Sequence, residues 1–197
     1  MKTKKTNLAT ACIMIFISLI SLGSCKNKQE EGVKESNASE VSETKASAPS
    51  MDIHTATFMG DLNAIKQHIA AGSDLDAKDQ YGSTPLTVAA TFGKTEVAKE
   101  LIMGGADINA KSGDGSTPLH TASFFCRTEI VKALLEKGAD KTIKNNYGST
   151  ALESVSAPYK DVKVFYEQIA KQLGPLGLKL DFERIEKTRP VIAEMIK

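Results

Sequence analysis

The sequence predicts an all-α protein: a solenoid of stacked helix-turn-helix units, with short hairpin loops between the units and a helical cap at the C-terminal end. The first observation is a repeated tetrapeptide. Gly-Ser-Thr-Pro begins at Gly82 and at Gly115, and Gly-Ser-Thr-Ala begins at Gly148, each 33 residues after the one before. A fixed period of this length indicates an array of small units that stack on one another. The second observation is the Thr-Pro pair that begins at Thr84 and at Thr117, because threonine is a favourable N-cap and proline suits the first helical position.

Each unit is expected to contain two short helices joined by a turn. Gly93 permits a positive φ at this turn, and Thr95 and Thr128 are expected to cap the second helix. Apolar residues follow at helical spacing, and Gly105 and Gly138 are expected to end the second helix in the left-handed region. No unit can bury its apolar face alone, so stability is roughly a sum over the units and their interfaces.

Two departures from the repeat stand out. Cys126 replaces the glycine that the other units carry at the turn between their helices, as at Gly93. A residue with a side chain is strained at positive φ, so this turn is expected to be distorted or held by its surroundings. In the fourth unit, Ala151 and Glu153 replace the proline and histidine of the preceding unit. The fourth unit is therefore expected to be degenerate.

The fullest copy of the repeat reads Thr-Pro-Leu-His-Thr-Ala at residues 117–122, and Gly-Ala-Asp follows at residues 138–140. In these motifs the chain resembles the ankyrin-repeat family, over about residues 52–156. The resemblance implies about three repeats and a degenerate fourth within residues 51–157. It also implies a structural role for His54 and His120, and His120 can close a local hydrogen bond with its N-cap threonine in the manner of a capping box. His68 is expected to be solvated.

The resemblance to ankyrin repeats implies that a partner protein binds at the hairpin tips and on the concave face lined by the first helices. The candidate partner-binding residues are Phe58, Met59, Gln80, Tyr81, Phe92, Asp114, Phe124, Phe125 and Tyr147. The phenylalanines at the ends of the first helices form a candidate apolar patch, of the kind that often marks an interface. The alternative is that part of the set turns inward and packs between units, and the sequence leaves open whether Phe92 and Phe124 are accessible.

Residues 158–197 follow the repeats and are expected to form a helical cap, because the end of a stack must be shielded. Apolar residues between Val162 and Leu173 fall at helical spacing, and Gly174-Pro175 should break this helix. Asp181 is expected to cap a further short helix, and Thr188-Arg189-Pro190 to begin the last one. The leucines after the break are expected to pack into the core, with docking of a partner as the alternative.

The N-terminal residues predict export and a lipid anchor. Lysines precede an apolar run of the length found in secretory signals. The run ends in Leu22-Gly23-Ser24-Cys25, which is similar to the lipobox of bacterial lipoproteins. This resemblance implies a signal peptide over residues 1–24 and a lipid on Cys25. Residues 25–50 are poor in apolar side chains, so they predict a disordered tether. The protein is therefore expected in the cell envelope, either at the periplasmic face of a membrane or at the cell surface.

Charge and motif content narrow the function. The formal net charge is +1, which lacks the strong basic footprint of a nucleic-acid-binding protein. Motifs of zinc proteases, serine hydrolases and phosphate loops are missing, so the sequence predicts neither an enzyme nor a cofactor or metal site. We expect a membrane-tethered protein-interaction module of the bacterial cell envelope with an unidentified protein partner. The alternatives are an immunity protein or inhibitor, an accessory protein of an envelope enzyme, a surface-displayed effector, and a redox protein using Cys126.

Overall fold

The structure is a computed structural model that describes residue 49 and residues 51–197. The predicted signal peptide, the predicted lipid site at Cys25 and all of the predicted tether except residue 49 lie outside the described residues. All the helices named below fall within residues 53–196.

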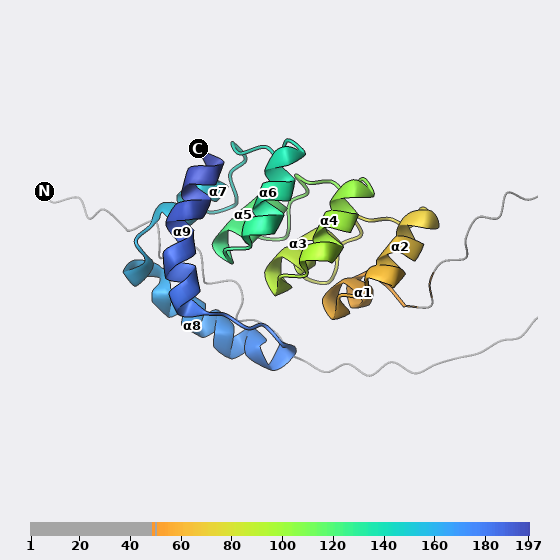
Figure 1. Cartoon of the computed structure of the whole chain (residues 1–197), viewed down its shortest axis with the longest axis horizontal. Coiled ribbons are helices and arrows are strands. Elements are labelled where there is room, and N and C mark those ends of the chain that lie inside the picture. The colour runs from red at the N-terminus through yellow and green to blue at the C-terminus, as the bar shows by residue number, and fades with distance from the viewer. Residues whose placement is uncertain (1–48, 50) are drawn as a thin grey trace, which may run out of the picture.

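The described residues form helices and loops without a strand, which confirms the all-α prediction (Figure 1). The helices, in chain order, are α1 (Ile53–Met59), α2 (Leu62–Ala70), α3 (Pro85–Phe92), α4 (Thr95–Met103), α5 (Pro118–Phe124), α6 (Thr128–Glu136), α7 (Ala151–Ser156), α8 (Tyr159–Leu173), the 3-10 turn η2 (Gly174–Leu176) and α9 (Phe182–Ile196). They stack into two layers. Helices α1, α3, α5 and α7 pack side by side in one layer, and α2, α4 and α6 pack side by side in the other.

The first helices begin as the Thr-Pro pairs predict. The hydroxyl of Thr84 accepts a hydrogen bond from the backbone N–H of Thr87 at 3.3 Å, with proline at the first helical position. The second helices begin differently from the prediction. Thr95 and Thr128 occupy the first helical position, and the N-cap residues are Lys94 and Arg127, which make no side-chain cap. The prediction of threonine caps was therefore wrong.

Lys94 and Arg127 instead reach back to the preceding unit. The Lys94 ammonium donates to the Met59 carbonyl at 3.4 Å, and the Arg127 guanidinium donates to the Thr91 carbonyl at 2.9 Å. Each bond joins the start of a second helix to the end of the first helix one unit earlier. These long side chains therefore tie neighbouring units together instead of capping their own helices.

Small and branched apolar side chains make one continuous core between the two layers. Ala56, Ala89, Ala90 and Ala122 are fully buried, which lets neighbouring first helices approach closely. The second helices add Ile65, Leu101 and Leu134, which are also fully buried. The core runs through all the units and ends on Ile192 and Ile196 of α9.

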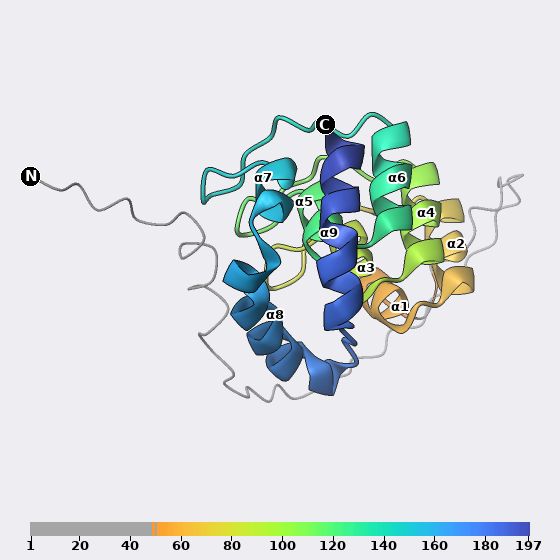
Figure 2. The same cartoon turned by 60° about the vertical axis from the view of Figure 1, so that its left-hand side comes forward.

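Helix α9 completes the fourth unit. It packs against α7 and α6, as α6 packs against α5 and α4, so it takes the place of the second helix that the fourth unit otherwise lacks (Figure 2). Asp181 caps it, because its carboxylate accepts from the backbone N–H of Arg184 at 3.0 Å. The expected break before Pro190 does not occur: α9 is one helix of 15 residues with the proline inside it. The extension thus continues the stack as well as covering its end.

Helix α8 is an excursion between the two helices of the fourth unit. It forms a second core cluster at the end of α5, in which Val162, Tyr166, Ile185 and Cys126 are buried together. The predicted break follows at Gly174, and Gly177 has a φ of 93°. Of the leucines after the break, Leu178 is buried and Leu176 is exposed, so the expected core packing holds for part of the set.

The buried Arg189 joins this excursion to the fourth unit. Its guanidinium donates to the Tyr166 hydroxyl at 2.7 Å and to the carbonyls of Ala157 at 2.9 Å and Ser154 at 3.3 Å. The Tyr166 hydroxyl in turn donates to the Phe124 carbonyl at 2.6 Å. A single buried side chain therefore links α9, α8, the end of α7 and, through Tyr166, the end of α5.

Candidate interaction surface

The hairpin tips stack closely on one another. A Cβ at Gly113 would lie only 2.7 Å from the Tyr81 carbonyl oxygen, so glycine is needed where these two hairpins meet. The Asn146 side chain donates to the Gly113 carbonyl at 3.2 Å, and the Asn146 backbone N–H donates to the Asp114 carbonyl at 3.0 Å. The tips therefore form one connected edge along the stack.

The four predicted binding residues at the tips differ in exposure. Gln80 and Tyr81 are exposed, and 64% of Tyr81 is accessible. Asp114 and Tyr147 are half-buried. The Asp114 carboxylate accepts from the Ser112 hydroxyl at 3.0 Å and from the Ser116 backbone N–H at 3.0 Å, so it fixes its own hairpin. Of the four residues, Tyr81 offers the largest free apolar surface.

Three side chains at the ends of α1 and α3 form what we call the aromatic patch: Phe58, Met59 and Phe92. The rings of Phe58 and Phe92 meet edge to face with centroids 4.8 Å apart. Phe58 is exposed, Phe92 is half-buried, and 63% of Met59 is accessible. The patch therefore bridges two neighbouring units and leaves apolar surface free.

The predicted row of aromatic residues does not extend to α5. The Phe124 ring stacks on the Tyr166 ring of α8 at 4.6 Å, so the excursion covers part of its face. Phe125 retains only 9% of its surface and packs edge to face against Phe124 at 5.2 Å. Phe125 was predicted as a binding residue, and its burial removes it from the accessible surface. No pattern in the sequence indicates that α8 returns to this position.

The histidine side chains form hydrogen bonds with backbone groups of the loops and helix ends. The Nε2 of His54 lies 3.0 Å from the Ala77 carbonyl, and the Nε2 of His120 lies 3.0 Å from the Ser149 carbonyl. The Nδ1 of His120 accepts from the Thr117 backbone N–H at 3.2 Å, as predicted for a capping box. His68 is buried and bonded to the Met51 carbonyl at 2.9 Å, so the expectation that it is solvated was wrong.

Cys126 occupies a strained turn. Its φ is 53°, the sole positive value for a residue other than glycine in the described part of the chain. Its thiol is buried against α9, with the Ile185 carbonyl 3.8 Å away, and burial raises its pKa to about 11. A redox or nucleophilic cysteine needs an accessible thiol with a lowered pKa. The geometry therefore argues against the redox alternative and explains how the strained turn is held.

Across residues 49 and 51–197, no group of three or more histidine, cysteine or acidic side chains is placed to hold a metal ion. The same residues contain no helix that is both long and apolar enough to span a bilayer.

The comparison with known families agrees with this architecture. A family model for ankyrin repeats matches residues 53–156 in three copies, which is more than half of the chain. This match covers α1 to α7 and ends before α8. No curated protein matches the chain. The matched repeats and the two stacked layers of helices show that the chain belongs to the ankyrin-repeat family.

Proposed function

We propose that this chain is a membrane-tethered module of the bacterial cell envelope that binds a partner protein through its hairpin tips and the aromatic patch. Ankyrin repeats are generally protein-protein interaction modules. The observation that carries the proposal is the aromatic patch itself. The rings of Phe58 and Phe92 meet across two neighbouring units, and Met59, next to Phe58 in the sequence, is exposed. Exposed apolar and aromatic side chains gathered in this way often mark an interface. Tyr81, on the edge formed by the hairpin tips, supplies a second exposed aromatic residue.

The tether is proposed from the sequence. The motif that ends at Cys25 resembles a lipobox, and a polar segment separates it from α1. A lipid on Cys25 would keep the repeats near a membrane while the segment lets them turn toward a partner. The partner is then an envelope protein, and the chain acts by binding rather than by catalysis.

The binding surface is tested by cross-linking the full-length protein to its neighbours in intact cells and purifying it. The test variant is Phe58→Ala/Met59→Ala. The matched control is Met103→Ala, at the C-terminal end of α4 in the other layer, because Met103 is 64% exposed and Met59 is 63% exposed. We expect one dominant cross-linked protein with the wild type and the control, and its loss with the test variant. Equal recovery with all three proteins would refute the assignment of the surface.

The anchor is tested separately with Cys25→Ser. We expect the wild type to incorporate a labelled fatty acid and to sediment with membranes, and the variant to do neither. A variant that still carries the label would show that the lipid is attached elsewhere, and a wild type without label would remove the lipid anchor from the proposal.

A further inference from the structure

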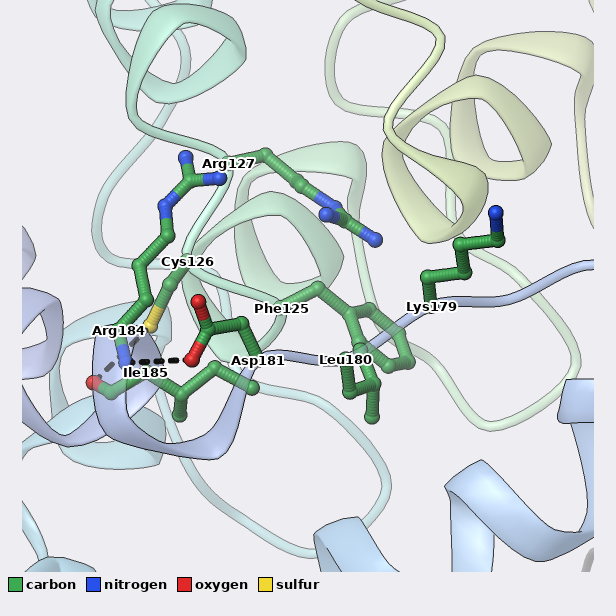
Figure 3. A pocket seen from close by; sticks show the side chains of 8 residues that line it. All are labelled: Phe125, Cys126, Arg127, Lys179, Leu180, Asp181, Arg184 and Ile185. Carbon is green, nitrogen blue, oxygen red and sulfur yellow. Dashed lines mark hydrogen bonds between the residues drawn. The ribbon is translucent and has the colours of Figure 1, made fainter.

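A small pocket of about 50 Å³ lies where the C-terminal extension returns to the stack (Figure 3). Its wall is formed by the turn between α5 and α6, by the segment that precedes α9 and by the first turn of α9. The charged residues in this wall are Arg127, Lys179, Asp181 and Arg184. We call this feature the basic pocket.

The charges of the basic pocket do not balance. Three of its charged residues are basic, and the one carboxylate, Asp181, is engaged in capping α9. The ion pairs found over residues 49 and 51–197 involve none of these four residues. The pocket therefore has an excess of positive charge that the described part of the chain does not neutralise.

Arg127 is held in place at the pocket. Its guanidinium donates to the Thr91 carbonyl at 2.9 Å and lies so close to Gly93 that an added Cβ would meet its Cζ at 2.9 Å. The Cζ also lies 5.9 Å from the centre of the Phe125 ring. Its Nε is buried and, among the described residues, has no hydrogen-bond partner. Arg127 is therefore held in one orientation at the pocket.

A second guanidinium stands near Arg127. Arg184 lines the same pocket, and burial together with the positive charge of Arg184 lowers the pKa of Arg127. In Figure 3 the Arg127 side chain is drawn above the ring of Phe125, with Arg184 on one side and Lys179 on the other. An anion in the pocket would offset this excess of positive charge and could accept charge-assisted hydrogen bonds.

The basic pocket adjoins the aromatic patch. Arg127 contacts Thr91 and Gly93, which flank Phe92 in the sequence. Lys94, beside Gly60, extends the positive charge along the same edge of the stack toward Met59. Arg127 therefore connects the pocket to the end of α3, which carries Phe92 of the patch.

We propose that the basic pocket receives an acidic side chain, aspartate or glutamate, of the protein that covers the aromatic patch. This inference rests on the proposed function. Guanidinium groups bind carboxylates through paired hydrogen bonds, and the small volume suits one side-chain carboxylate rather than an extended ligand. The apolar patch supplies contact area, and the acidic side chain sets the orientation of the partner.

The test uses the full-length protein in mild detergent and two fluorescent peptides with blocked ends, hexaglutamate and hexaglutamine, followed by anisotropy at low salt. We expect hexaglutamate to bind at least about tenfold more tightly than hexaglutamine. Lys179→Gln/Arg184→Gln should weaken hexaglutamate binding by at least about tenfold. Both residues are exposed, so the fold should persist. The matched control, Lys187→Gln/Lys197→Gln, removes two exposed lysines of α9 and its C-cap, which do not line the pocket, and should change binding less than about twofold.

Three results would overturn the proposal: equal binding of the two peptides, equal loss in the two double variants, or displacement of hexaglutamate by inorganic phosphate at a lower concentration than by unlabelled hexaglutamate. The last result would make the pocket a site for a free oxyanion. Failure of the proposal for the basic pocket can be distinguished from failure of the proposed function. A partner that is still cross-linked by Lys179→Gln/Arg184→Gln and lost with Phe58→Ala/Met59→Ala would keep the proposed function and reject the pocket.

Discussion

Replacing Arg189 by methionine should loosen the attachment of the C-terminal extension to the stack. Only 2% of Arg189 is accessible, and its guanidinium makes the three hydrogen bonds that join α9 to Tyr166 of α8 and to the end of α7. Its Cζ also lies 5.8 Å from the centre of the Tyr166 ring. Methionine has a comparable length and fills much of the same space without offering a donor.

The expected loss in the free energy of unfolding follows from these contacts. Two of the three hydrogen bonds are short, at 2.7 Å to Tyr166 and 2.9 Å to the Ala157 carbonyl. A hydrogen bond from a charged group contributes about 1.5–3 kcal/mol, and a carbonyl left buried without a partner costs about 1–3 kcal/mol. Part of this is offset, because methionine does not carry the desolvation penalty of a buried guanidinium. We expect the free energy of unfolding to fall by about 2–4 kcal/mol.

The assay is urea unfolding followed by circular dichroism, together with amide hydrogen exchange of α8 and α1. The matched control is Lys187→Met, which makes the same apolar replacement of a cation on the exposed face of α9. We expect faster exchange in α8 of the Arg189 variant, with α1 little changed. A loss of stability below about 0.5 kcal/mol, equal to that of the control, would refute the reasoning.

Three further predictions follow from single residues. Burial lowers the pKa of His120 below its ordinary value of 6.5, so the unfolded chain binds the proton more readily and the free energy of unfolding should fall as the pH drops from about 7 to 5. His120→Gln should remove this part of the fall. A variant whose stability depended on pH as the wild type does would contradict the prediction. Cys126, with a pKa of about 11, should react with a thiol reagent at pH 8 about a hundredfold more slowly than an unfolded cysteine peptide; equal rates would contradict its burial. Gly113→Ala, whose Cβ would lie 2.7 Å from the Tyr81 carbonyl oxygen, should lower stability in urea by about 1–3 kcal/mol. Gly174→Ala has open space around it and should serve as a neutral control.

The repeat itself could be predicted because its signals are local. The threonine caps, the prolines after them and the turn glycines each act within a few residues, and the period of 33 residues repeats them. The strain at Cys126 could be predicted for the same reason, since it stands where other units carry glycine. The N-cap residues of α4 and α6 could not be predicted in this way, because Lys94 and Arg127 contact the preceding unit and such contacts are not visible in the local sequence.

The C-terminal extension was predicted as helical, but its path was not. A spacing in the sequence marks the buried face of α9: Ile185, Arg189, Ile192 and Ile196 are separated by four, three and four residues. The charged Arg189 interrupts the apolar spacing in the sequence, and Pro190 suggests a helix start that the structure lacks. Tertiary packing outweighs both local signals, because the fourth unit needs a second helix to cover α7 and α6.

The same return of the chain that completes the fourth unit also builds the basic pocket. Arg184 and Lys179 come from α9 and the segment before it, whereas Arg127 belongs to the repeats. The aromatic patch is made by α1 and α3 and does not involve the extension.

In a repeat array each unit contacts only its neighbours, so a loosened end need not disturb distant units. Arg189→Met should therefore weaken hexaglutamate binding at urea concentrations that leave α1 protected from exchange. If α1 and α8 lost protection together, the extension and the repeats would form one cooperative unit, and the pocket could not be separated from the patch.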